Sequence, residues 1–63
     1  MNPRIAIFAK DIQYITGRTE RYARKLLKEL REHHGKASHQ FVSLGEFCEY
    51  TGLPYEEVVR KIL

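Results

Sequence analysis

Apolar residues recur every three or four positions between residues 16 and 35, the period of an amphipathic α-helix. At about 100° per residue, one side of this helix carries an apolar stripe of Tyr22, Ala23, Leu26, Leu27 and Leu30. The opposite side carries the cations Arg21, Arg24, Lys25, Lys28 and Arg31. We therefore predict a basic helix over residues 19–34, with one face in the core and the other toward water or a polyanion.

The residues before this helix predict two short elements. Residues 5–8 are apolar and partly β-branched, which favours a brief strand. Residues 9–15 predict a short helix, because Asp11 falls in the first turn, where free amide groups attract a carboxylate. Gly17 is expected to end it by adopting a positive φ. Thr19 is the predicted N-cap of the basic helix.

The second half of the chain shows a similar order of signals. Residues 40–43 are a second strand candidate, and Ser43 and Glu46 have the spacing of a capping box. A helix over residues 44–50 should follow and end at Gly52. Pro54 is expected at the first position of a last helix. That helix has an acidic first turn, Glu56 and Glu57, and an apolar face of Tyr55, Val58, Val59 and Ile62.

Residues 5–27 match residues 40–62 at an offset of 35. Thr16-Gly17 falls on Thr51-Gly52, and Asp11 falls on Glu46. Chance is the alternative explanation, because small helical proteins reuse the same caps, but we favour a structural repeat. We predict a single, mainly α domain over residues 1–63, with four helices arranged as two helix-turn-helix-like units. Strands 5–8 and 40–43 would pair antiparallel, because neither half alone hides enough apolar surface.

Length and composition narrow the function classes. A chain of 63 residues has a small core, in which a deep catalytic cleft is hard to build, so we expect no enzyme. One cysteine excludes an internal disulfide, and no segment has the pattern of a membrane span or a signal peptide, which favours a cytoplasmic protein. His33, His34, His39 and Cys48 lack the spacing of zinc ligands. We expect no metal, cofactor or small-molecule substrate.

Positive charge is concentrated in one part of the chain. The net charge is +3, but residues 18–36 carry seven Lys or Arg against three Glu, whereas residues 44–63 carry two against four Glu. Such a basic segment behind a glycine turn favours a nucleic-acid partner. The alternative is an ordinary solvated face, on which Glu20, Glu29 and Glu32 exchange ion pairs with their neighbours.

The segments Asp11-Ile12, Ile15-Thr16-Gly17 and 19–27 together resemble the helix-turn-helix unit of small bacterial or phage DNA-binding proteins of the MerR-like and excisionase-like kinds. In that pattern a glycine makes the turn, and Ala23 and Leu26 stand at the apolar positions that anchor the second helix. Gln13 and Arg18 depart from it, at positions where a small and an aliphatic residue are usual. The resemblance covers roughly 25 residues and implies recognition of DNA.

Charge separates the two units, because Glu56 and Glu57 would repel phosphate at the start of the last helix. We therefore assign DNA contact to the first unit. The candidate DNA-binding residues are Arg18, Thr19, Arg21, Tyr22, Arg24, Lys25, Lys28, Arg31 and Lys36. Those at the start of the basic helix are expected to reach base edges, and Lys28, Arg31 and Lys36 are expected to contact phosphates.

The sequence thus predicts a small sequence-specific protein that binds double-stranded DNA, a transcriptional regulator or a recombination accessory factor. It would act as a homodimer or in cooperative arrays, because one module buries limited surface. The alternative is a protein-binding adaptor or inhibitor on a helix-turn-helix scaffold, with Tyr55, Val58 and Val59 of the last helix as the partner surface or the homodimer contact. RNA binding is a third hypothesis, although the glycine-aromatic motifs of common RNA modules are absent.

Overall fold

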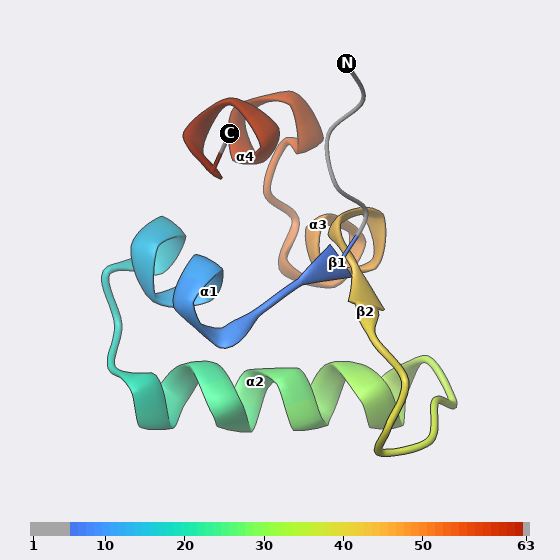
Figure 1. The fold of residues 1–63 in the computed structure, drawn as a ribbon. Helices are drawn as coiled ribbons and strands as arrows, with labels where there is room; N and C mark the ends of the chain where they lie inside the picture. Colours follow the sequence, from blue (N-terminus) through green and yellow to red (C-terminus); the bar gives the residue numbers. More distant parts are fainter. Residues whose placement is uncertain (1–5, 63) are drawn as a thin grey trace.

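The computed structural model describes residues 6–62. The elements are β1 (Ala6–Ile7), α1 (Ala9–Thr16), α2 (Glu20–His33), β2 (Val42–Ser43), α3 (Leu44–Thr51) and α4 (Tyr55–Ile62). In Figure 1, α2 runs along the bottom of the view, the strands, α1 and α3 lie above it, and α4 lies at the top. The predicted fold class, four helices with a short antiparallel pair of strands, is confirmed.

The strands are shorter than predicted, and Ile5 lies outside the described residues. Ala6 pairs with Ser43 and Ile7 with Val42. The ladder stops before Phe8, whose N–H donates to the Asp11 carboxylate at 2.8 Å at the start of α1. On the other strand, residue 40 belongs to a turn, in which its N–H donates to the Ala37 carbonyl at 3.1 Å.

The helix boundaries follow the predicted signals closely, with one correction. α1 and α3 each extend to the threonine that precedes the glycine, and α2 runs from Glu20 to His33, with Thr19 as its N-cap. α4 begins at Tyr55, so Pro54 is not the first helical residue as predicted. Pro54 stands one position earlier, where its carbonyl accepts the first helical hydrogen bond, from the Val58 N–H at 3.1 Å.

The two halves have the same local structure at an offset of 35. α1 and α3 correspond from end to end, and α2 and α4 begin at corresponding residues. Gly17 and Gly52 both have left-handed backbones, with φ of 71° and 80°, and each donates its N–H to the carbonyl four residues earlier at 2.8 Å. Thr16 and Thr51 each donate a hydroxyl to the carbonyl four residues earlier, at 2.6 and 2.8 Å.

The core is formed where the two halves meet. Its buried members are Ile7, Ile12, Ala23, Leu26, Leu30, Val42, Leu44, Phe47, Cys48 and Val58. Each predicted helix contributes at least one of them, and within residues 6–62 no polar or charged side chain is buried. Tyr55 is a correction, because it was predicted on the apolar face of the last helix and is 46% exposed. No helix in this range is long and apolar enough to cross a membrane.

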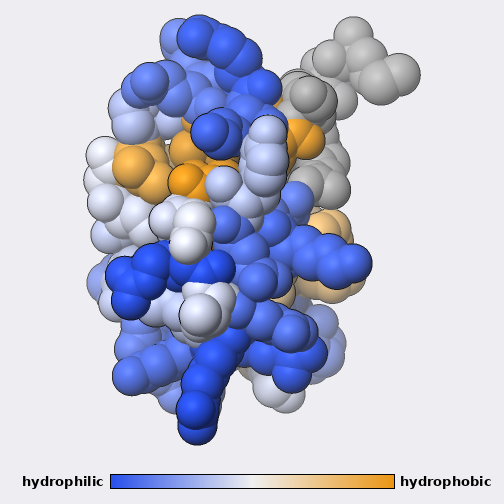
Figure 2. Space-filling model, turned by 90° about the vertical axis from the view of Figure 1, so that its left-hand side faces the viewer, coloured by the Kyte–Doolittle hydropathy of each residue, from blue (hydrophilic) through white to orange (hydrophobic). Residues whose placement is uncertain are grey.

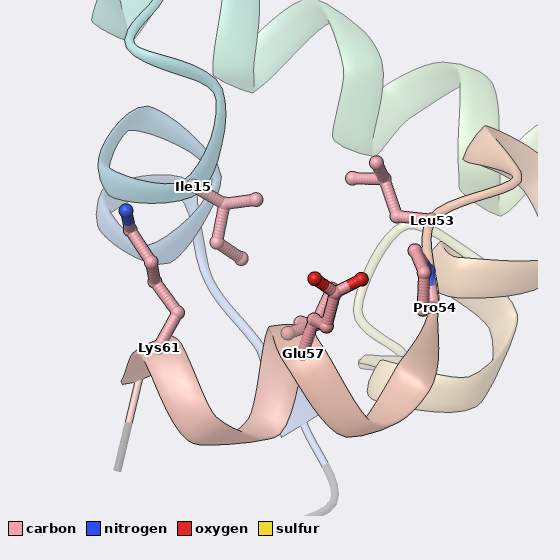
Figure 3. A pocket seen from close by; sticks show the side chains of 6 residues that line it. Ile15, Leu53, Pro54, Glu57 and Lys61 are labelled. Atoms are coloured by element: carbon pink, nitrogen blue, oxygen red, sulfur yellow. The ribbon is translucent and has the colours of Figure 1, made fainter.

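A shallow groove of about 150 Å³ separates α1 from α4. Figure 2 looks onto the side of the molecule where α2 begins and shows an apolar patch in the upper half, with hydrophilic side chains above it and below it. In Figure 3, Ile15 of α1 and Leu53 and Pro54 of the α3–α4 connection line the groove, and Glu57 and Lys61 of α4 stand at its side.

Candidate nucleic-acid interface

A three-residue connection, residues 17–19, joins α1 to α2. The left-handed Gly17 turns the chain, and the N–H of Arg18 donates to the Thr16 hydroxyl at 3.2 Å. The Thr19 hydroxyl then accepts the N–H of Tyr22 at 3.1 Å, which caps the first turn of α2. These local bonds hold the start of α2 exposed at the surface of the molecule.

Four candidate residues form what we call the free-cation face: Arg18, Arg21, Lys25 and Lys28. All four are exposed, and none makes an ion pair with a residue in the described range 6–62. The Arg18 guanidinium lies 4.2 Å from the centre of the Tyr22 ring. Tyr22 itself is half-buried against the core, so its ring supports Arg18. The hydrophilic lower half of Figure 2 covers this part of the molecule.

Arg24 extends this face but has a partner on its own helix. Its guanidinium lies 2.6 Å from the Glu20 carboxylate, one turn earlier, and both side chains are largely exposed. Exposed pairs of this kind stabilise a protein by about 0–1 kcal/mol. A phosphate group can therefore replace Glu20 as the partner of Arg24 at little cost.

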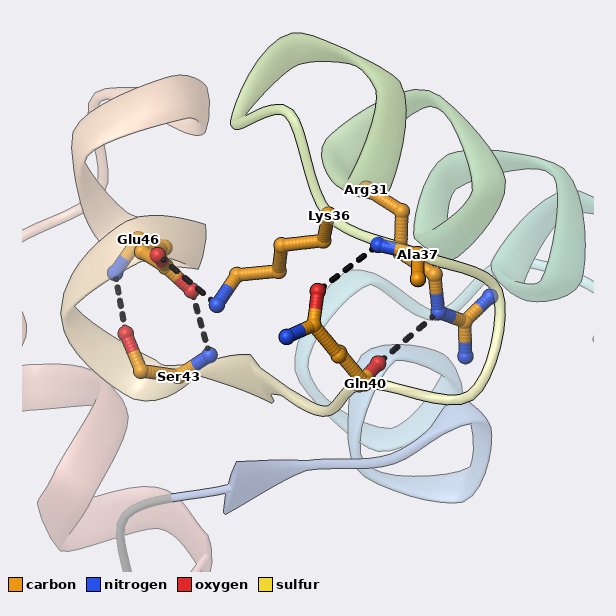
Figure 4. Close-up of polar contacts among 6 residues, drawn as sticks. All are labelled: Arg31, Lys36, Ala37, Gln40, Ser43 and Glu46. Carbon is orange, nitrogen blue, oxygen red and sulfur yellow. Dashed lines mark hydrogen bonds and ion pairs between the residues drawn. The ribbon is translucent and has the colours of Figure 1, made fainter.

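Arg31 of α2 binds the loop that follows the helix, and Lys36 in that loop binds α3 (Figure 4). The Arg31 Nε donates to the carbonyl of Gln40 at 3.1 Å, and the Gln40 side chain accepts the N–H of Ala37 at 2.7 Å. Lys36 forms an ion pair of 3.2 Å with Glu46 of α3, with both side chains about three-quarters buried. The structure therefore separates Lys36 from the other candidate residues.

The Glu46 carboxylate is the best-supported charge in this network. It accepts the N–H of Ser43 at 2.9 Å, while the Ser43 hydroxyl accepts the N–H of Glu46 at 3.0 Å. The pKa of Glu46 is lowered, first by the Ser43 backbone bond and then by Lys36, against the opposing effect of burial. Glu46 therefore stays ionised at neutral pH, and Lys36 stays paired with it.

Sequence reasoning missed an aromatic pair at the end of the sheet. Phe8 and Phe41 meet edge to face, with ring centres 5.7 Å apart and planes at 87°. Both were treated only as strand residues. The sequence did contain a signal for this pair. Phe8 adjoins Ile7 and Phe41 adjoins Val42, both buried, and adjacent strand residues point to opposite faces.

The histidines form ring contacts at the end of α2. The centre of the His33 ring lies 4.9 Å from the centre of the His34 ring and 5.0 Å from the centre of the Tyr50 ring on α3. Among residues 6–62, no three His, Cys, Asp or Glu side chains gather where they could hold a metal ion. Burial raises the pKa of the Cys48 thiol, which keeps it protonated and weakly nucleophilic.

The candidate residues thus fall into two groups. One group is exposed at and after the glycine turn: Arg18, Thr19, Arg21, Arg24, Lys25 and Lys28. Arg31 and Lys36 bind to other parts of the chain, and Tyr22 is half-buried against the core. Comparisons with models of protein families, with curated proteins and with solved structures give no match for this chain. The functional assignment therefore depends on this geometry.

Proposed function

We propose that this protein binds double-stranded DNA with α2 and the turn before it, as a cytoplasmic transcriptional regulator or recombination accessory factor and not as an enzyme. The free-cation face is the observation that carries the proposal. Its four members are exposed and without an ion pair in the described residues 6–62. Cations in that state are available to neutralise phosphates or to donate to base edges.

The dimensions of α2 suit the major groove. Its 14 residues span about 21 Å at 1.5 Å per residue, and the groove, about 12 Å wide, admits one α-helix. Arg18 lies just before the helix, and Arg21 and Lys25 lie in its first two turns, the end from which helix-turn-helix proteins contact bases. An arginine at that end can donate two hydrogen bonds to guanine, worth about 1–3 kcal/mol of discrimination.

The second unit provides an internal comparison. At the offset of 35, Arg21 corresponds to Glu56, which is exposed at the start of α4. A carboxylate at that position repels phosphate, although the local backbone is the same. Charge therefore favours α2 over α4 as the helix that meets DNA.

Fluorescence anisotropy with labelled duplexes, over a range of salt concentrations, tests the proposal. Four neutralised phosphates give a log–log slope of about −4. The double variant Arg21→Glu with Lys25→Glu should abolish most of the binding, whereas Arg60→Glu on α4, which makes the same change of charge per residue, should have little effect. Equal effects of the two variants, or an affinity that does not change with salt concentration, would contradict the proposal of DNA binding.

Selection of bound duplexes from a random pool tests the sequence-specific part of the proposal. Enrichment of a common motif would indicate base readout, and its symmetry would report a dimer. Recovery of the pool without enrichment would contradict sequence specificity and leave only binding through phosphates.

The groove between α1 and α4 favours a second candidate function, a protein-binding adaptor. The apolar side chains of Ile15 and Leu53 line it (Figure 3), and Leu53 is 37% exposed. The partner surface predicted from the sequence was Tyr55, Val58 and Val59. Of these, Val58 is buried, Val59 is half-buried and Tyr55 is exposed. Pull-down with and without nuclease separates the two functions. A partner that survives nuclease and is lost with Leu53→Glu would favour the adaptor.

A further inference from the structure

The register of the sheet decides where Phe8 and Phe41 point. Ile7 pairs with Val42, so Phe8 and Phe41 are the next positions beyond the last pair of the ladder. Ile7 and Val42 are 2% and 1% exposed, which places their side chains in the core. Because side chains alternate along a strand, the two phenylalanines stand on the outer face. They are 42% and 68% exposed.

This aromatic pair lies beside the cationic side of α2. The Arg31 Nε donates to the carbonyl of Gln40, the residue immediately before Phe41. Arg24 and Arg31 are seven residues apart, close to two full turns, so they share one flank of the helix. Phe41 therefore borders the far end of a basic flank whose near end adjoins the free-cation face.

We propose that Phe41, supported by the Phe8 ring, is an apolar wedge that inserts between base pairs in the minor groove and bends the duplex bound by α2. The proposal rests on the proposed DNA-binding function. Side chains such as Phe and Leu partly unstack base steps in this way, and the bend brings more DNA onto the protein. Arg24 on the same flank supplies charge complementarity for such a bend, because a phosphate can replace its exposed partner Glu20.

The ring geometry favours a wedge over a stacking platform for single strands. Successive unpaired bases stack on flat, open ring faces. Phe8 and Phe41 stand at 87° to each other, so together they present no common flat face. A wedge needs one projecting side chain, and Phe41 is the most exposed of the large hydrophobic residues in the range 6–62.

Energy transfer between dyes at the two ends of a short duplex tests the proposal. Wild-type protein should shorten the end-to-end distance. Phe41→Ala should lose the bend and bind roughly tenfold more weakly, with an unchanged salt slope, because no phosphate contact is removed. Phe41→Leu should restore much of the bend, since leucine also acts as a wedge. Tyr55→Ala removes an exposed aromatic ring from α4 and should behave as wild type.

The outcomes separate the wedge from the function on which it rests. Duplex binding without a bend, a bend that survives in Phe41→Ala, or tighter binding to single strands that Phe41→Ala abolishes would each overturn the wedge alone. Absence of any duplex binding by the wild type would remove the proposed function and the wedge together. Thermal melts of both alanine variants exclude a folding defect as the cause of a lost bend.

Discussion

At the scale of single residues, the backbone at Gly17 has the clearest consequence for function. Its φ of 71° lies in the left-handed region, which side chains with a Cβ disfavour by about 1–2 kcal/mol. No atom outside the neighbouring residues lies within 4 Å of the place where a Cβ would stand. The requirement for glycine is therefore conformational and not a matter of space. The same conformation sets the direction in which α2 leaves the turn.

Gly17→Ala should accordingly lower the free energy of unfolding by about 1 kcal/mol. Gly45→Ala is the matched control. Gly45 lies inside α3, and an added Cβ would make only an ordinary contact, 3.8 Å from the Ser43 hydroxyl oxygen. That variant should raise stability by roughly 0.5–1 kcal/mol, because alanine favours a helix. Urea denaturation measures both, and effects of the same sign would contradict the argument.

At the scale of the elements, the start of α3 is held by polar contacts from two directions. The reciprocal bonds between Ser43 and Glu46 close a capping box, and Lys36 adds an ion pair from the loop after α2. A short helix of eight residues has little stability of its own. Its cap and its contacts therefore decide whether it forms.

This network makes stability depend on pH. Folding lowers the pKa of Glu46 below its ordinary value of 4.5. The stabilisation that ionised Glu46 gives to the folded protein is therefore complete above that pH. The contribution is lost as the pH falls through the folded value. Glu46→Gln should be less stable than wild type at pH 7, and the two should converge as the pH falls below the folded pKa of Glu46. Thermal melts between pH 3 and 7 measure this, with the exposed Glu49→Gln as the control; parallel curves for wild type and Glu46→Gln would contradict it.

The elements themselves could be predicted well because their signals are local. Thr19, Gly17 and the Ser43–Glu46 pair act through hydrogen bonds to backbone three or four residues away, so their spacing is visible in the chain. The strand ends could not be predicted in this way. Phe8 is apolar like its strand neighbours, yet its N–H caps α1 by donating to Asp11, and apolar character does not reveal where a strand gives way to a helix.

At the scale of the whole molecule, the small core leaves little reserve of stability. A domain of 63 residues has a free energy of unfolding of about 3–9 kcal/mol. Phe47 is the largest side chain that is fully buried within residues 6–62. Truncation of such a residue costs about 3–5 kcal/mol.

Phe47→Ala should therefore lose a large part of the free energy of unfolding and melt far below the wild-type temperature. Phe41→Ala makes the same chemical change at a position that is 68% exposed, so it should melt close to wild type. Circular dichroism at 222 nm during heating, a standard measure of helix content, follows both. A cooperative transition of Phe47→Ala at the wild-type temperature would show that the core is not shared by the two halves.

The sequence predicted where the candidate site lies, but not which of its cations are bonded to other parts of the chain. Arg21, Lys25 and Lys28 of the free-cation face could be assigned to the outer side of α2 from periodicity alone, and Arg18 from its place in the turn before the helix. Arg31 and Lys36 lie on the predicted segment as well, yet each bonds to a group that is distant in the chain. Only the fold brings Gln40 and Glu46 to them, so charge in a sequence does not tell which cations are free.

By itself, the sequence determined the order of the elements, their caps, the glycine turns and the concentration of charge on α2, because each depends on interactions within a few residues. The tertiary structure alone decided which apolar side chains became core, that Tyr55 and Leu53 remained exposed, and that Phe8 and Phe41 met at the end of the sheet. These outcomes depend on which surfaces cover each other, and such contacts join residues that are far apart in the chain. The difference has a physical cause: hydrogen bonds at helix ends are short-range and local, whereas burial is a property of the assembled molecule.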